Sequence, residues 1–160
     1  FKQALDLGAD YIVQMDADLS HSPVYIPDML RQLDNSDVVV GSRYTQGGGV
    51  DPDWNFKRRF LSSFAIWTIR VLTGLKVKDV TSGFKAYRES ALQELDLSEF
   101  RCRGFGFQTE VAHACQRREF RVVEHPIIFS DRAEGSSKMS INIMLEAIWR
   151  LSLLRIRGRG

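Results

Sequence analysis

The sequence is organised around the stretch Tyr11-Ile-Val-Gln-Met-Asp-Ala-Asp-Leu-Ser-His-Ser-Pro23, which opens apolar and ends around two carboxylates. Residues 11–15 predict a buried strand of the parallel-sheet kind. Asp16 and Asp18 follow the end of that strand, where open α/β sheets bind ligands. Two carboxylates there suit a hard divalent cation, with further positions left for phosphate oxygens and water. The alternative is a plain strand-to-helix turn in which Asp18 or Ser20 caps a helix.

Length and composition indicate one ordinary globular domain. The chain has 160 residues, 44% of them hydrophobic and 26% charged, and its net charge of +2 says little about partners. Cys102 and Cys115 have no metal or redox spacing and are expected to be free thiols in a reducing compartment. No signal peptide or membrane-spanning run is visible. Phe1 opens in what looks like the middle of a helix, so we expect a piece of a longer protein.

Helix and strand patterns alternate through the first part of the chain. Residues 1–7 predict a helix ended by Gly8, Ser22-Pro23 starts a second helix, and residues 37–41 form a second buried strand. This order implies a parallel sheet with helices on its faces. Arg43 would then emerge at the same edge as the two aspartates. The glycine-rich residues 45–50 are either a ligand-contacting loop or a linker.

The middle of the chain supplies further candidates. A helix is predicted over residues 54–73, and its Arg58 and Arg59 oppose the helix dipole, so they either bind an anion or are merely solvated. A turn over 79–84 leads into a strand at 84–88 and a short helix near 90–95. The next helix is predicted at 108–118, which places Glu110 in its first turn, where a carboxylate suits the dipole. Strands at 121–124 and 127–130 are interrupted by Pro126, which fits an edge or a bend.

The last part of the chain is cationic. Residues 131–139 combine Arg132, Lys138, two serines and a glycine, which is the chemistry of an anion-binding loop. Residues 140–157 predict an apolar-rich helix flanked by arginines. It is too charged to span a membrane and suits a membrane surface, or else it packs on the sheet or on a partner.

Six motifs occur in order along the chain: Asp-Ala-Asp-Leu-Ser-His (16–21), Gly-Ser-Arg-Tyr (41–44), a triple glycine (47–49) before Trp54, Asp79 with Thr-Ser-Gly-Phe (81–84), Gly-Phe-Gln-Thr-Glu (106–110) and Arg-Ala-Glu-Gly-Ser-Ser-Lys-Met (132–139). Together they resemble the dolichyl- or polyprenyl-phosphate mannose synthases, which belong to family 2 of the inverting glycosyltransferases. The family's early strands, with a Pro-Thr-Tyr-Asn-Glu-like motif and a base-recognising segment, have no counterpart here.

The resemblance implies a GT-A fold: an α/β, Rossmann-like, mixed and mostly parallel sheet with helices on both faces. Residues 1–139 would be the C-terminal part of such a catalytic domain, without its nucleotide-recognition strands. Residues 140–160 would form the amphipathic helix. Since nucleotide recognition lies in the missing strands, we expect the 160-residue chain by itself to be inactive.

The resemblance also implies GDP-mannose as donor, Mg²⁺ or Mn²⁺ as cofactor, and a polyprenyl or dolichyl phosphate as acceptor. The enzyme would act at the cytoplasmic face of a membrane, either as a peripheral protein or anchored by segments outside these residues, with no nucleic-acid partner. The catalytic residues it implies are Asp16, Asp18, Arg43 and Arg132. Asp16 and Asp18 match the metal motif, whereas Ser20 stands where relatives often carry a metal-binding Gln. The substrate- and phosphate-binding residues it implies are Arg43, Arg58, Arg132, Lys138, Asp79, Ser82 and Glu110.

Other functions stay open from the sequence. The same chemistry with another sugar nucleotide, such as a glucose donor, is the nearest alternative, because the sugar- and base-reading residues largely precede Phe1. A non-catalytic phosphate- or lipid-binding module is a second, although it would not need all four of Asp16, Asp18, Arg43 and Arg132. A nucleotide hydrolase is disfavoured, since no water-activating base stands out and His21 is expected to be structural.

Overall fold

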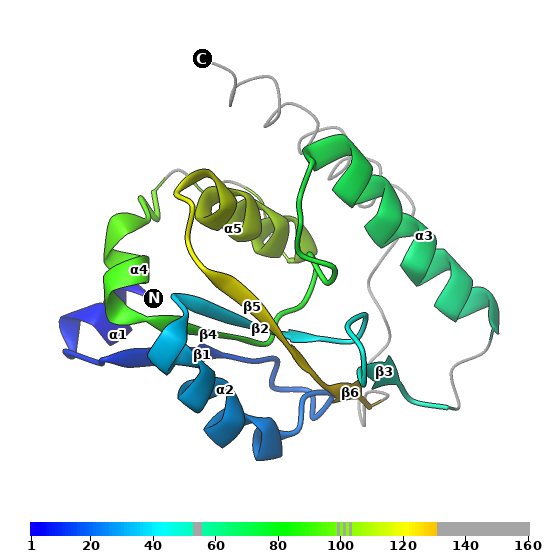
Figure 1. Ribbon diagram of the computed structural model, residues 1–160, viewed down its shortest axis with the longest axis horizontal. Coiled ribbons are helices and arrows are strands. Elements are labelled where there is room, and N and C mark those ends of the chain that lie inside the picture. Colours follow the sequence, from blue (N-terminus) through cyan, green and yellow to red (C-terminus); the bar gives the residue numbers. More distant parts are fainter. Residues whose placement is uncertain (53–55, 99, 101, 103, 131–160) are drawn as a thin grey trace.

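The structure is a computed structural model that describes residues 1–52, 56–98, 100, 102 and 104–130. These residues form a mixed α/β layer arrangement (Figure 1). Its elements are α1 Lys2–Asp6, β1 Tyr11–Gln14, η1 Pro23–Tyr25, α2 Ile26–Gln32, η2 Leu33–Asn35, β2 Val38–Ser42, β3 Gly49–Val50, α3 Phe56–Thr73, β4 Lys85–Arg88, α4 Glu89–Glu94, α5 Phe105–Arg117, β5 Val122–Pro126 and β6 Ile128–Phe129.

The central sheet has the strand order β1-β4-β2-β5. β2 and β5 are parallel, while β4 lies antiparallel between β1 and β2. Three strands therefore run in one direction and one runs against them, which confirms the mixed, mostly parallel sheet. The helix–strand alternation alone suggested parallel strands only, and the intervening β4 is what that pattern missed.

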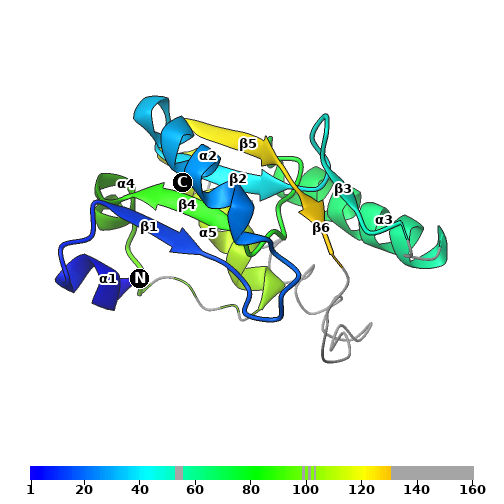
Figure 2. The ribbon, with the colours of Figure 1, turned by 90° about the horizontal axis from the view of Figure 1, so that it is seen from below.

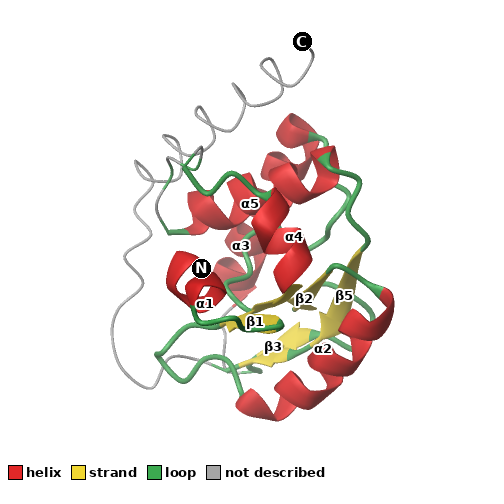
Figure 3. Cartoon of the chain, turned by 90° about the vertical axis from the view of Figure 1, so that its left-hand side faces the viewer, coloured by secondary structure: helices red, strands yellow, loops and turns green. Residues whose placement is uncertain are grey.

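The sheet separates two apolar cores, because successive side chains of a strand point to opposite faces. Val38 and Val40 of β2 pack under α3, α4 and α5, whereas Val39 joins Met29 and Leu33 beneath α2. Figure 3 shows α2 on one side of the sheet and the other helices on the opposite side. Met29 and Leu33 are fully buried, and each such side chain stabilises the fold by about 1.5–3 kcal/mol. β2 is buried along its whole length, as its unbroken apolar run predicts. The same prediction for residues 11–15 is wrong, because β1 is an edge strand paired antiparallel with β4, and Tyr11 is exposed.

The boundaries of α5 and β5 differ from the sequence prediction in ways that affect Glu110 and Pro126. Helix α5 starts at Phe105 rather than at 108, because Gly104 with φ 58° makes the turn that precedes it. Glu110 is therefore inside the helix, which has no acidic residue in its first turn, and the dipole explanation for Glu110 is wrong. Pro126 ends β5 instead of lying between two strands. It is on an edge strand, where a residue without an N–H is tolerated.

A second, two-stranded sheet closes the end of the molecule. β3 and β6 pair in parallel, Gly49 with Ile128 and Val50 with Phe129. The end of the glycine-rich segment is thus a strand rather than only a loop. Figure 2 shows β3 and β6 beyond the end of the four-stranded sheet. β4 runs antiparallel to β1 and β2. The turn that enters β4 therefore lies at the end of the sheet where β1 and β2 finish, and this end is called here the sheet edge of the site.

Candidate active site

The acidic loop after β1 is held in shape by its own side chains. The Ser20 backbone N–H donates to the Asp18 carboxylate at 3.1 Å, and the Ser20 hydroxyl donates to the same oxygen. Leu19 between them has φ 64°, so the turn is tight and left-handed. The loop is also tied to the end of β6, where the Ser130 N–H donates to the Ser20 carbonyl at 3.2 Å. Asp18 is thereby oriented by Ser20.

His21 packs between the acidic loop and two aromatic side chains of the core. It is buried, and its ring lies 5.1 Å from Phe84 and 5.3 Å from Phe129 between ring centroids. Its Nδ1 accepts the Asp16 N–H at 3.2 Å, so the unprotonated Nδ1 faces the loop. Burial lowers the pKa of His21, and this outweighs the opposing effect of the nearby Asp16 charge. A neutral, packed histidine agrees with the structural role expected for it.

Asp16 lies against the turn that enters β4. A side chain on Gly83 would place its Cβ 2.7 Å from the nearest carboxylate oxygen of Asp16, closer than van der Waals contact permits. The side chain of Asp16 is 48% exposed, so the carboxylate rests on the Gly83 backbone with one side open to solvent. The structure thus brings the acidic motif and the Thr-Ser-Gly-Phe motif together.

Arg43, just beyond β2, forms a buried ion pair with Asp79. Its Nε donates to one carboxylate oxygen at 2.7 Å and an Nη donates to the other at 2.8 Å. That Nη also donates to Thr81 at 3.0 Å, and the Arg43 backbone N–H adds a 3.0 Å bond to Asp79. The Asp79 side chain is fully buried, and that of Arg43 is 12% exposed. This two-pronged pairing fixes the plane of the guanidinium.

The groups around Arg43 keep its guanidinium charged. Burial by itself would lower the pKa of Arg43, but the hydrogen bonds and charge of Asp79 outweigh it, and the pKa is raised. The guanidinium also lies 5.3 Å from the Tyr44 ring centroid and 5.1 Å from that of Phe129. The second Nη makes no hydrogen bond within the described residues, so donors remain for an anionic ligand.

Two of the candidate substrate residues brace the backbone. The Ser82 hydroxyl is buried and donates to the Gly41 carbonyl at 2.6 Å, which joins the turn to the end of β2. Glu110 in α5 accepts the Cys102 N–H at 2.9 Å. Glu124 accepts the N–H groups of Lys78 and Asp79 at 3.1 and 3.0 Å. The geometry therefore gives Ser82 a positioning contact, and a direct substrate contact by Ser82 or Glu110 stays a prediction.

Three candidate cations have no described side chain. Arg58 belongs to the first turn of α3, but its side chain lies outside the described part of the structure, as do Arg132 and Lys138. The predicted helix over 140–157 also lies outside it. Ser130, the last described residue of this region, is bonded to Ser20 of the acidic loop. The described part of this region therefore ends beside the acidic loop.

The donor set of the loop fits a hard divalent cation. Asp16 offers a half-exposed carboxylate and Asp18 an oriented one. The described residues contain no cluster of three histidine, cysteine, aspartate or glutamate side chains that could enclose a metal. Two carboxylate ligands are what Mg²⁺ commonly takes from a protein when substrate phosphates and water supply the rest. The loop accordingly suits a cation that arrives with a diphosphate.

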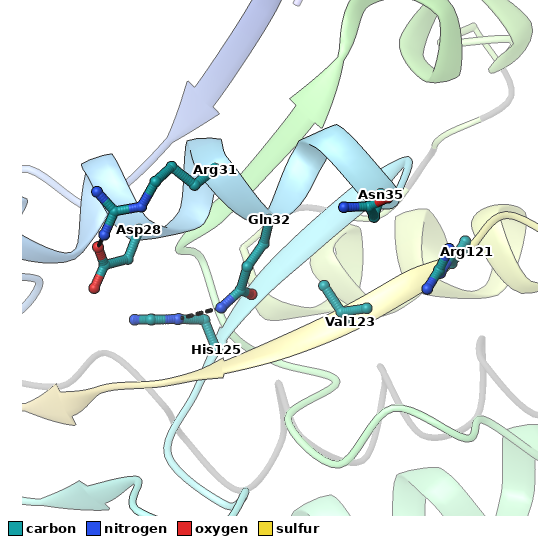
Figure 4. A pocket seen from close by; sticks show the side chains of 7 residues that line it. All are labelled: Asp28, Arg31, Gln32, Asn35, Arg121, Val123 and His125. Carbon is teal, nitrogen blue, oxygen red and sulfur yellow. Dashed lines mark hydrogen bonds and ion pairs between the residues drawn. The ribbon is translucent and has the colours of Figure 1, made fainter.

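A separate groove lies along α2 and the edge strand β5 (Figure 4). It has a volume of about 500 Å³ and is lined by Asp28, Arg31, Gln32, Asn35, Arg121, Val123 and His125. Gln32 and His125 face each other across it at 2.9 Å. None of the candidate site residues lines this groove, so it is distinct from the acidic loop.

Several residues of the site were not singled out from the sequence. Gly83 and Thr81 were quoted only as part of a motif, and Glu124 received no role. A glycine inside a polar turn is the one signal available, since a missing side chain allows a close approach. The pairing of Arg43 with Asp79 spans 36 positions, and no local pattern reports such a contact.

The chain is similar in sequence to two bacterial mannosyl-transferring proteins. The chain is 38% identical over 148 residues to the undecaprenyl-phosphate mannosyltransferase of Micrococcus luteus, covering 92% of this chain and 60% of that protein. It is 38% identical over 160 residues to the polyprenol monophosphomannose synthase of Mycolicibacterium smegmatis, covering 99% of this chain and 60% of that protein. The chain thus spans about three fifths of the length of these relatives.

Solved structures confirm the fold. Glucosyl-3-phosphoglycerate synthase from Mycobacterium tuberculosis, in complex with Mn²⁺ and UDP-glucose, matches with a TM-score of 0.53 and 16% identity over 94% of this chain and 49% of that one. The same enzyme with phosphoglyceric acid matches at 0.52 and 14% identity, over 93% and 48%. These likenesses establish the GT-A type of α/β fold. The family model described as glycosyl transferase family 2 matches residues 7–96, and the chain belongs to that family.

Proposed function

We propose that the full-length protein transfers mannose from GDP-mannose to a polyprenyl or dolichyl phosphate with inversion at the sugar carbon. The observation that carries this is the meeting of Asp16, Asp18 and the Arg43–Asp79 pair at one sheet edge. The two relatives at 38% identity, named for mannosyl transfer to polyprenyl carriers, support the choice of sugar and acceptor.

Asp16 and Asp18 would hold Mg²⁺ or Mn²⁺ together with the donor diphosphate. A bound cation supplies Lewis-acid stabilisation of the charge that collects on the leaving nucleoside diphosphate. Ser20 holds Asp18 in place and is already committed to it, so we assign Ser20 to orientation rather than to the metal. The Mn²⁺ complex of the structural neighbour supports the type of ion.

The cations have complementary tasks. Arg43, held by Asp79, offers its remaining N–H donors to a phosphate, and we assign Arg58, Arg132 and Lys138 to donor and acceptor phosphates as well. An acceptor phosphate is already an anion, so the reaction needs no general base to activate it. His21 agrees with this, since it is buried and its Nδ1 already accepts the Asp16 N–H.

The reaction would take place at the surface of a membrane, on its cytoplasmic face. The carriers named for both relatives are lipid phosphates. No helix in the described part of the chain is long and apolar enough to cross a bilayer. Residues 1–139 would belong to the catalytic domain and residues 140–160 to a surface helix.

The test uses the purified full-length protein, Mg²⁺ or Mn²⁺, labelled sugar nucleotides and polyprenyl phosphate. Formation of polyprenyl-phosphate mannose from GDP-mannose, abolished by a chelator and restored by metal, is the expected result. Transfer from UDP-glucose but not from GDP-mannose would instead select the glucosyl alternative. Release of free sugar with no lipid product would indicate a hydrolase, and binding without turnover a non-catalytic module.

A further inference from the structure

Helix α3 exposes a continuous aromatic face. Five large side chains on it are accessible to solvent: Phe56, Phe60, Phe64, Trp67 and Val71. Their spacing of three or four residues places them on one side of the helix, and this set is called here the aromatic face of α3. Neighbouring rings stack along it, with centroids 6.0–6.5 Å apart. Phe56 is 81% exposed, and Trp67 is 59% exposed.

The opposite side of α3 provides the apolar contacts between this helix and the core. Ala65, Ile66, Ile69 and Thr73 are buried under it. The aromatic face is therefore not part of the core, and its exposure works against the stability of a protein in water. Contiguous apolar patches of this kind mark contacts with another protein or with a membrane.

The charges of α3 favour an anionic partner. Residues 56–73 contain no aspartate or glutamate, and Lys57-Arg58-Arg59 opens the helix. Cations at a helix N-terminus oppose the helix dipole, so an external anion would offset that cost. Aromatic side chains beside lysine and arginine are the composition of helices that lie in the headgroup region of a bilayer.

Helix α3 is also fixed next to the candidate site. Tyr44 directly follows Arg43, and its hydroxyl is hydrogen bonded to the Ser62 hydroxyl of α3 at 2.9 Å. If the acceptor is a lipid phosphate, its phosphate lies at the level of the headgroups. A surface that lies on the membrane should then be close to Arg43, as α3 is through the contact of Tyr44 with Ser62.

We propose that the aromatic face of α3 lies on an anionic lipid bilayer and sets the site at the height of the lipid headgroups. The helix lies along the membrane plane, and about 22 Å of its length, from residue 56 to 71, contributes. This membrane contact adds to the proposed function and rests on it, because a lipid-phosphate acceptor is what requires a membrane. The aromatic face of α3 is a membrane contact in addition to the one predicted for the helix over residues 140–157.

The test compares two variants of the full-length protein with the parent. One carries Phe60→Gln, Phe64→Gln and Trp67→Gln; the matched control carries Leu7→Gln and Val24→Gln, which remove exposed apolar side chains on other elements. Co-sedimentation with phosphatidylglycerol–phosphatidylcholine vesicles should fall at least tenfold for the first and stay within twofold for the control. Binding by the parent should weaken with salt, since exposed charges contribute. Circular dichroism verifies that both variants are folded.

Transfer assays distinguish this contact from the proposed function. The triple variant should lose at least tenfold in kcat/KM with acceptor embedded in vesicles and stay within twofold with a short, water-soluble polyprenyl phosphate. Vesicle binding by the folded triple variant equal to that of the parent overturns the bilayer contact, whether or not transfer is observed. A drop from dimer to monomer in the triple variant, with vesicle binding retained, assigns the face to a second copy and also overturns it. Vesicle binding that needs the aromatic face, without any sugar transfer by the parent, leaves the contact standing and refutes the function.

Discussion

At the scale of single residues, the acidic loop depends on two carboxylates that cannot substitute for each other. Asp18 is held by Ser20, whereas Asp16 rests on Gly83. Asp18→Asn removes a negative ligand but keeps the size of the side chain and one oxygen for Ser20. We expect transfer by the full-length protein to be lost while the melting temperature changes little. Asp34→Asn, at an exposed carboxylate, is the control, and normal turnover by Asp18→Asn would refute the metal assignment.

The close approach of Gly83 to Asp16 allows a test that adds an atom instead of removing a charge. In Gly83→Ala the new methyl group would stand 2.7 Å from the Asp16 carboxylate and displace it. We expect at least a tenfold fall in kcat/KM and a higher Mn²⁺ concentration for half-maximal activity. Gly49→Ala is the control, because its methyl group would meet Ile128 at 3.4 Å, an ordinary contact. An unchanged metal requirement in Gly83→Ala would contradict the placement of Asp16.

At the scale of elements, the Arg43–Asp79 pair joins the end of β2 to the turn before β4. Removing Asp79 leaves the Arg43 charge buried without its partner, which costs about 3–5 kcal/mol of unfolding free energy. Asp79→Ala should therefore destabilise the protein by that amount in urea unfolding. The exposed pair Asp28–Arg31 provides the comparison, and Asp28→Ala should cost less than about 1 kcal/mol. Equal effects of the two substitutions would mean that Asp79 does not organise this edge.

At the scale of the whole molecule, stability should depend on pH through a lysine in the core. Lys85 of β4 is fully buried, and its ammonium donates to the side chain of Gln108 at 2.8 Å and to the Gln108 carbonyl at 3.1 Å. These bonds fasten α5 to the sheet. Burial lowers the pKa of Lys85 from 10.5 to about 8. In this range the unfolded chain binds more protons than the folded one, so the free energy of unfolding rises with pH.

The contribution of Lys85 should grow by about 1 kcal/mol between pH 7.5 and pH 9. Urea unfolding at both pH values should show this rise in the parent and in Lys78→Met, whose lysine is exposed, but not in Lys85→Met. The interval ends at pH 9 because burial also raises the pKa of Cys115, from 9.0 to about 11. That thiol makes stability fall at higher pH. An equal rise in Lys85→Met would mean that Lys85 titrates normally.

Much of this molecule could be predicted from local sequence patterns. The apolar runs before Asp16 and Arg43 predict strands, and the Ser22-Pro23 pair predicts a helical start. Burial was predicted correctly for β2 but wrongly for β1, because only the sheet order shows that β1 is an edge strand. Two such strands with helices between them place Asp16, Asp18 and Arg43 at one edge, because parallel strands end on the same side. The acidic motif and the order of the other motifs also indicated the family. These features depend on residues that are neighbours in the chain, so short-range patterns report them.

Tertiary structure decided which distant groups meet. The antiparallel insertion of β4 between β1 and β2 brings Gly83 under Asp16 and Asp79 onto Arg43. It also puts Lys85 inside the core, where a strand pattern would not place an ammonium group. Helix α3 has apolar residues on both sides, and only packing shows that one side is buried and the aromatic side exposed. Such outcomes follow from the free energy of the whole assembly, in which burial and pairing across tens of residues outweigh local preference.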